Sequence, residues 1–248
     1  MAITSKVPNR VSKTISYRNG SRELYYRLQS TDEEVIKHVL LGRQYDLSLL
    51  PRPHAGELFE FLRRKEAAGL RPLVVDAGAN IGASAVYFTA NMPHAQVIAI
   101  EPEPDNFDLL AKNVEGLSVQ PLRAAISSSP GRATVVDPGR GHWGYRTRAD
   151  DGSHPDSVPR ITVNDIYASQ PADVFPFIVK VDIEGGEMDL FSANTEWVER
   201  TPVIMVELHD WMFPKGGTAR PFLQCVSKLD RDFIQMSQEI FSISNRLE

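Results

Sequence analysis

The chain has 248 residues, of which 42% are hydrophobic and 24% are charged, so it can form one large domain or one domain with an appendage. Its formal net charge of −5 and its pI of about 5.7 argue against nucleic acid as a partner. A single cysteine, Cys225, excludes an internal disulfide framework and a zinc site built from cysteines.

No targeting or membrane segment is visible in the sequence. The first twenty residues carry scattered charges and lack the apolar centre of a secretory signal. No apolar run approaches the roughly 18 residues that a membrane helix needs. We therefore expect a cytoplasmic protein without a membrane span.

The front third, residues 1–70, is predicted to be a small cap made of a hairpin and helices. After a loose arm over residues 1–12, the pattern alternates around Asn19-Gly20, a dipeptide that suits a two-residue turn. Thr31 begins a pattern that resembles a capping box. The expected elements are a hairpin over 14–28, a helix from Thr31 to Gly42, and a second helix that ends near Gly69.

Residues 71–248 alternate short apolar runs with helical segments, which is typical of a parallel sheet built from βαβ units. The expected strands are 73–76, 97–101, 118–122, 177–182 and 202–207, with two short strands over 233–243 that complete the sheet. We therefore predict an α/β Rossmann-like domain with helices on both faces of a mostly parallel sheet.

The rest of the domain is organised around the turn after the first strand, Asp76-Ala77-Gly78-Ala79-Asn80-Ile81-Gly82. A buried parallel strand that ends in this way leads into a ligand crevice, with the next helix beginning below it. Glycines let the backbone approach a ligand closely. A dinucleotide fold places a pyrophosphate here, and an acid would repel it. Asp76 therefore predicts a positively charged ligand.

A second acid, Glu101, ends the next strand, where an acid in a doubly wound sheet accepts hydrogen bonds from both hydroxyls of a ribose. Asp76 and Glu101 together predict an adenosine-type cofactor with a cationic tail, as in S-adenosylmethionine. The residues expected to hold it are Asp76, Gly78, Asn80 and Glu101, with Asn106 and Ala125 near the adenine. The alternative is that both acids are ordinary helix caps.

Three blocks of the sequence resemble the signature of a known family. Val-Asp-Ala-Gly-Ala-Asn-Ile-Gly (75–82), Glu-Pro-Glu-Pro-Asp-Asn-Phe (101–107) and Lys-Val-Asp-Ile-Glu-Gly-Gly-Glu (180–187) are similar to those of FkbM-family methyltransferases. The resemblance covers residues 71–210. It implies the class I methyltransferase fold, with a mostly parallel seven-stranded sheet. It also implies S-adenosylmethionine-dependent methylation, usually of a hydroxyl on a sugar, lipid or natural product.

The third block also has a physical interpretation. On a strand, Lys180, Asp182 and Glu184 project to one side of the sheet. A buried lysine needs a partner, so we expect Lys180 to pair with one of these acids. Asp182, at the strand tip, is expected to face the methyl-donor end of the cofactor and to take part in catalysis. Glu184 is a candidate acceptor contact, and a purely structural pairing is its alternative.

His209, at the end of the last parallel strand, is the predicted general base, because its ordinary pKa lies near neutral pH. Its alternative is a surface histidine or a helix cap. Hard oxygen ligands can also gather a divalent cation. The candidate set is Asp182, Glu184, Glu207, His209 and Asp210. Because their spacing matches no recognised metal motif, we predict no metal site and keep metal dependence as the minor alternative.

An irregular insert rich in glycine and proline occupies residues 137–159. Within it, aromatic and arginine side chains alternate with glycines, as in a mobile flap over a polar acceptor. Trp143 and Tyr145 are the candidate acceptor contacts. A β-hairpin that packs these aromatics on the core is the equal alternative.

The predicted function is transfer of a methyl group from S-adenosylmethionine to a hydroxyl of a small-molecule acceptor. One rival is a nicotinamide-dependent oxidoreductase, which the spacing Gly-x-x-x-Gly after an acid disfavours. The other is a non-catalytic protein that binds S-adenosylmethionine.

Overall fold

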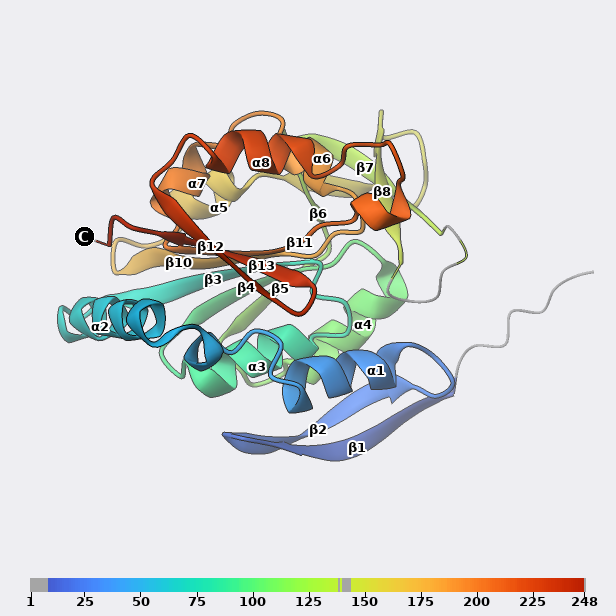
Figure 1. Cartoon of the computed structure of the whole chain (residues 1–248). Coiled ribbons are helices and arrows are strands. Elements are labelled where there is room, and N and C mark those ends of the chain that lie inside the picture. The colour runs from blue at the N-terminus through green and yellow to red at the C-terminus, as the bar shows by residue number, and fades with distance from the viewer. Residues whose placement is uncertain (1–8, 138, 140–143, 248) are drawn as a thin grey trace, which may run out of the picture.

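The computed structural model describes residues 9–137, 139 and 144–247, and its centre is a seven-stranded sheet in the order β12-β13-β11-β10-β3-β4-β5 (Figure 1). The strands are β3 (Arg71–Ala77), β4 (Gln96–Ile100), β5 (Val119–Leu122), β10 (Val174–Val181), β11 (Val203–Glu207), β12 (Arg231–Met236) and β13 (Glu239–Ser244). Five neighbours, from β5 to β11, run parallel, whereas β13 pairs antiparallel with both β11 and β12. The predicted Rossmann-like α/β class is confirmed, with a sheet that is mixed at one edge.

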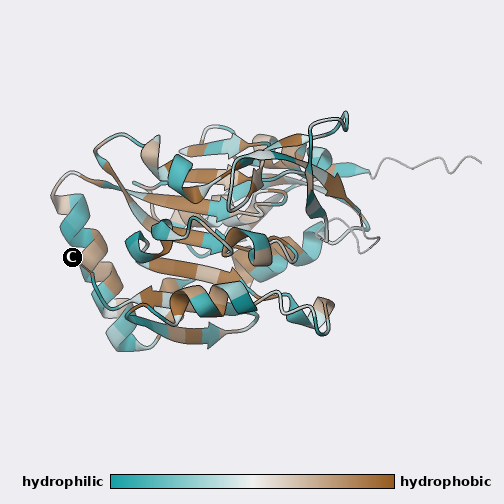
Figure 2. Ribbon diagram, turned by 90° about the horizontal axis from the view of Figure 1, so that it is seen from above, coloured by the Kyte–Doolittle hydropathy of each residue, from teal (hydrophilic) through white to brown (hydrophobic). Residues whose placement is uncertain are grey.

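Helices cover both faces of this sheet (Figure 1). One face carries α2 (Arg52–Ala67), α3 (Ala83–Asn91) and α4 (Pro104–Asn113), and the other carries α5 (Val163–Ala168), α6 (Glu187–Leu190), α7 (Glu196–Arg200) and α8 (Arg220–Val226). Each face of the sheet packs against its helices in a separate hydrophobic core, and alternate residues of β3 point into one core or the other. Val74 lies in the first core, and Leu73 and Val75 lie in the second. The central strands are accordingly the most hydrophobic part of the ribbon (Figure 2). In the part of the chain that the structure describes, none of the helices combines the length and apolarity needed to cross a bilayer.

The N-terminal cap packs on helices α3 and α4, which cover one face of the sheet (Figure 1). Its elements are β1 (Arg10–Tyr17), β2 (Gly20–Arg27), α1 (Asp32–Ile36), a π-helical turn (Lys37–Leu41) and a 3₁₀ turn (Leu47–Leu49). The predicted hairpin is present, but its first strand already begins within the segment that we expected to be a loose arm. Thr31 precedes α1 and makes no capping hydrogen bond through its side chain, so the predicted capping box is wrong. Leu24 and Tyr26 share one hydrophobic cluster with Val74 of β3, while a domain division at residue 70 stays a prediction.

A second, four-stranded sheet in the order β6-β9-β7-β8 was not predicted. It consists of β6 (Ala125–Ile126), β7 (Gly131–Val136), β8 (Arg146–Asp150) and β9 (Val158–Ile161). Strands β7 and β8 pair antiparallel, from Arg132 opposite Asp150 to Val136 opposite Arg146. The insert that was expected to be irregular therefore contributes β8 and the start of β9. The hairpin alternative is confirmed for the pairing of β7 with β8, whereas the packing of its aromatic side chains on the core stays a prediction.

Candidate functional site

A cavity of about 240 Å³ lies at the carboxyl ends of the parallel strands, beside the switch point between β3 and β10. Doubly wound sheets bind their ligands at such a point. The predicted site residues that line it are Gly78, Asn80, Glu101, Asn106, Ala125, Tyr145, Asp182, Glu184 and His209. Asp76 is fully buried and contacts two lining residues, Ser84 and Lys180. The predicted acceptor contact Trp143 lies outside the described residues.

Gly78 fixes the turn after β3. Its φ is +79°, and a Cβ atom on it would overlap the carbonyl oxygen of Asp182. The backbone N–H groups of Gly78 and Ala79 both donate to the carbonyl oxygen of Ile100 at 3.0 Å. Glycine is therefore required by the close approach of two strand ends, since any side chain would block it. The result is that the tips of β3, β4 and β10 meet at the cavity.

Asp76 and Lys180 form a buried ion pair between β3 and β10. The Nζ atom of Lys180 lies 3.2 Å from a carboxylate oxygen of Asp76 and 3.6 Å from one of Asp182, and it donates to the carbonyl oxygen of Gly78 at 2.7 Å. Burial alone would lower the pKa of Lys180, but the carboxylates of Asp76 and Asp182 outweigh it and raise this pKa. The expected pairing of Lys180 with an acid of the third block is confirmed. Its nearer partner, Asp76, was not predicted.

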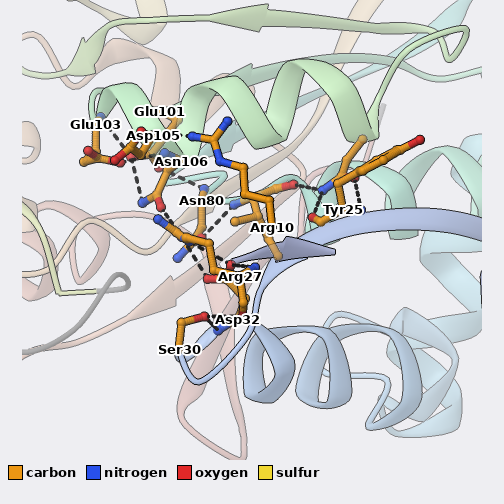
Figure 3. A network of polar contacts seen from close by, with 12 residues as sticks. Arg10, Tyr25, Arg27, Ser30, Asp32, Asn80, Glu101, Glu103, Asp105 and Asn106 are labelled. Carbon is orange, nitrogen blue, oxygen red and sulfur yellow. Dashed lines mark hydrogen bonds and ion pairs between the residues drawn. The ribbon is translucent and has the colours of Figure 1, made fainter. Parts of the chain in front are cut away.

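Glu101 is a buried acceptor at the tip of β4 (Figure 3). Its Oε1 atom accepts hydrogen bonds from the N–H of Glu103 at 3.0 Å and from Nδ2 of Asn106 at 3.4 Å. Its Oε2 atom accepts a hydrogen bond from the N–H of Asn80 at 2.9 Å. A carboxylate oxygen has two lone pairs, so Oε2 retains one for a ligand hydroxyl. Burial raises the pKa of Glu101 to about 7, although these hydrogen bonds act to lower it. The charge of Glu101 therefore changes near neutral pH.

At the other end of the cavity, the imidazole of His209 lies among carboxylates. Its Nδ1 atom is 2.9 Å from Oε1 of the buried Glu187, and its Nε2 atom is 3.7–3.9 Å from oxygens of Asp182, Glu184 and Glu207. Glu187 comes from α6, whereas the other carboxylates lie at the ends of β10 and β11. This group of five side chains, which we call the acidic end, was only partly predicted, because Glu187 was not singled out.

Three side chains of the acidic end, those of His209, Glu184 and Glu207, have raised pKa values. Burial opposes the charge of His209, but its hydrogen bond to Glu187 and the nearby carboxylates raise its pKa to about 9. Burial and the neighbouring Asp182 raise the pKa of Glu184 and of Glu207 to about 7. At neutral pH His209 is therefore an imidazolium that donates hydrogen bonds. The general-base role that its ordinary pKa suggested fits Glu184 and Glu207 better.

Asp182, Glu207 and His209 also offer ligand atoms that lie within 4.8 Å of one another, close enough to share a divalent cation. A metal-bound imidazole must be neutral at the coordinating nitrogen. The raised pKa of His209 opposes that state at neutral pH. Metal binding therefore remains the minor alternative for these three residues.

Segments outside the three sequence blocks also reach the cavity. Gln44 and Tyr45 line it from the N-terminal cap, and the Lys180 ammonium lies 5.8 Å from the centre of the Tyr45 ring. The front third of the chain is therefore part of the site, although the sequence indicated no chemistry in it. Tyr145 lines the cavity just before β8, and burial raises its pKa to about 12, which keeps its hydroxyl protonated. Trp211, which is 66% exposed, lines the cavity after β11.

Comparison with protein families decides the class of this site. The family described as the methyltransferase FkbM domain matches residues 76–241, which is more than half of the chain. The chain belongs to the FkbM methyltransferase family. The match begins at the tip of β3 and ends in β13, so it contains the Glu101 end and the acidic end of the cavity. The N-terminal hairpin and α1 lie outside the match. Membership of this family argues against the oxidoreductase alternative.

Curated relatives of this FkbM-family chain are methyltransferases by name. It is 30% identical over 174 residues to the hexuronic acid methyltransferase AglP of Haloferax volcanii, with 69% of each protein covered. It is 30% identical over 126 residues to the methyltransferase sdnD of Sordaria araneosa, with 49% of this chain and 42% of sdnD covered. Methyltransferase 1 of Beauveria bassiana is 26% identical over 179 residues, which cover 61% of this chain and 70% of that protein.

Solved structures with a similar arrangement share little sequence with this chain. Monomeric WbdD matches 80% of it, and the match covers 40% of WbdD, with 12% identity and a TM-score of 0.43. The plantazolicin methyltransferase BpumL, solved with SAH, matches 88% of this chain and 92% of its own, with 8% identity and a TM-score of 0.40. Because these TM-scores lie below 0.5, the family of this chain is assigned from the family match, and its fold from the order of the strands in the sheet.

Proposed function

We propose that this FkbM-family protein uses S-adenosylmethionine to methylate a hydroxyl group of a small acceptor, such as a sugar, lipid or natural product. The observation that carries the proposal is Glu101, a buried carboxylate that lines the cavity at the tip of β4 and whose Oε2 atom has a lone pair left beside its hydrogen bond from Asn80. A ribose hydroxyl is the donor that this position suits. Gly78, Asn80, Asn106 and Ala125 line the cavity around it.

The charge at the opposite end of the cavity suits a cationic methyl donor. The carboxyl groups of Asp76, Asp182, Glu184, Glu187 and Glu207 outnumber the two cations among them, Lys180 and the His209 imidazolium. S-adenosylmethionine supplies a methyl group on a sulfonium, so the reaction forms a C–O bond, breaks an S–C bond and releases the hydroxyl proton. Glu207 and Glu184, with a pKa of about 7, are suited to accept that proton. Asp182 and the His209 imidazolium are suited to orient the acceptor hydroxyl.

Calorimetry and an acceptor panel test this proposal. We expect S-adenosylmethionine and S-adenosylhomocysteine to bind and NADH not to bind. Radiolabelled methyl transfer to a panel of sugars, hexuronic acids, lipids and phenols should identify the acceptor class, and the name of AglP is the reason to include hexuronic acids. Absence of binding of both sulfur compounds would overturn the proposal. Binding without transfer to any panel member would favour a non-catalytic protein.

A further inference from the structure

Arg27, the last residue of β2, reaches from the N-terminal hairpin to the cofactor end of the cavity (Figure 3). Its guanidinium is buried and binds the carboxylate of Asp32 through two nitrogen atoms, at 2.9 Å and 2.8 Å. Its Nη2 atom also donates to Oδ1 of Asn106 at 2.6 Å. Asn106 lies in the first turn of α4, so Arg27 joins the hairpin to the helix that follows the tip of β4.

The chemistry of arginine decides which way the Asn106 amide faces. A guanidinium has only donors, so the group that it contacts must be the amide oxygen. The amide nitrogen then points the other way, where Nδ2 lies 3.4 Å from Oε1 of Glu101. Glu101 therefore meets a donor, whereas the reversed amide would place an oxygen against its carboxylate. The fully buried carboxylate of Asp32 fixes the position of the Arg27 guanidinium beside Asn106.

We propose that Arg27 is a positioning residue for the cofactor: it fixes the Asn106 amide so that Glu101 is held ready to bind the ribose. This inference rests on the proposed function. It assigns part of the cofactor site to the N-terminal hairpin, which lies outside the residues matched by the family. Arg27 acts through Asn106, and its guanidinium is not among the groups that line the cavity.

The hydrogen bond from Asn106 to Glu101 also predicts that binding of the ribose depends on pH. Ionised Glu101 is the better acceptor, and its pKa of about 7 means that binding weakens as the pH falls below 7. The charged groups that act on Glu101 are Glu103 from its own segment and Lys180 from β10, and the Arg27–Asp32 pair lies on the far side of Asn106. Because the Asn106 hydrogen bond lowers the pKa of Glu101, loss of that bond moves the weakening to higher pH.

The experiment measures binding of 5′-methylthioadenosine, which carries the nucleoside and a thioether but no amino-acid group that titrates. The variants are the double substitution Arg27→Met with Asp32→Asn, which leaves no buried charge unpaired, and Asn106→Asp, which keeps an acceptor for Arg27 and removes the donor to Glu101. Arg10→Ala is the matched control. It removes an exposed ion pair, 3.0 Å long, between the same hairpin and Asp105 of the same helix.

We expect both test variants to bind about tenfold more weakly than wild type, with the pH midpoint of binding moved upward, while Arg10→Ala binds like wild type. Melting curves show which variants are folded. If a folded test variant keeps wild-type affinity and midpoint, the positioning role is wrong and the proposed function stands. Should the double variant not fold, wild-type affinity and midpoint in a folded Asn106→Asp protein would still overturn the inference. If wild type binds neither this probe nor S-adenosylhomocysteine, the proposed function fails, and the inference fails with it.

Discussion

The Nδ1 atom of His209 lies 2.9 Å from Oε1 of Glu187, and both side chains are buried. The second carboxylate oxygen of Glu187 has no hydrogen-bond partner among the described residues. A buried carboxylate in this position needs a cation beside it. The imidazolium form of His209 provides that cation, which is the physical reason for its pKa of about 9.

Substitution of Glu187 tests this relationship. In Glu187→Gln the hydrogen bond can persist while the charge is removed, so we expect the pKa of His209 to fall from about 9 toward its ordinary value of 6.5. The imidazole C–H resonance of His209, assigned from a His209 variant, reports this titration by NMR. A titration that stays near pH 9 in Glu187→Gln would show that Glu187 is not the cause.

Removal of the imidazole should affect turnover more than cofactor binding. We expect His209→Ala to lower turnover about 100-fold, because the acceptor hydroxyl loses a charged group that orients it. Affinity for S-adenosylhomocysteine should change little, since Glu101 is at the other end of the cavity. His209→Asn, which keeps a donor for Glu187, controls for unfolding. Unchanged turnover in a folded His209→Ala protein would make His209 a structural residue.

Gly78 should tolerate no side chain. In Gly78→Ala the new methyl group would overlap the carbonyl oxygen of Asp182, at a backbone φ that L-residues rarely adopt. We expect the free energy of unfolding to fall by about 3 kcal/mol or more, measured by urea denaturation. Gly56→Ala is the matched control, because nothing lies within 4 Å of its added Cβ in α2. A Gly78→Ala protein as stable as Gly56→Ala would contradict the close approach of β3 and β10.

The sequence predicted the sheet and the strand-end residues because both follow from local patterns. An apolar run that ends in an acid marks a strand tip, and parallel strands bring their tips to one edge. The partners across the sheet could not be predicted in this way. Lys180 faces Asp76 because β10 and β3 pair in register at these two positions, and register between strands distant in sequence has no local signal.

The electrostatics of the site also depended on tertiary structure. His209 was expected to titrate near neutral pH, but its pKa is raised by Glu187, which lies on a short helix twenty-two positions earlier in the chain.

The four-stranded sheet was missed because β6 and β9 are very short and the insert is rich in glycine and proline. The contact of Arg27 with Asn106 joins residues seventy-nine positions apart.

Chelation tests the metal alternative. Because a protonated His209 already offsets the carboxylates of the acidic end, we expect dialysis against EDTA to leave turnover and cofactor affinity within about twofold of the untreated protein. Calorimetric titration with Mg²⁺ and Mn²⁺ provides a readout that is independent of the acceptor. Activity lost on chelation and restored by one of these ions would instead assign them to Asp182, Glu207 and His209.

The ligand-free protein should become less stable as the pH rises through neutrality. Burial raises the pKa of Glu101, Glu184, Glu207 and Glu239 from 4.5 to about 7. A group whose pKa is raised by folding stabilises the fold at pH values below its unfolded pKa, and this contribution is lost as the pH rises through the folded pKa. His209 acts in the same direction up to about pH 9. We therefore expect the melting temperature to be on the order of 5 °C lower at pH 8 than at pH 6.

The substitution Glu239→Gln tests whether the fall in melting temperature comes from buried carboxyl groups or from the total charge of the protein. Glu239 is buried in β13, so removing its titration should flatten the fall in melting temperature between pH 6 and pH 8. Glu57→Gln, on the exposed face of α2, makes the same chemical change and should leave the slope unchanged. Bound S-adenosylhomocysteine should stabilise both variants through mass action. A melting temperature that rises from pH 6 to pH 8 in the ligand-free wild type would contradict the raised pKa values of these buried carboxyl groups.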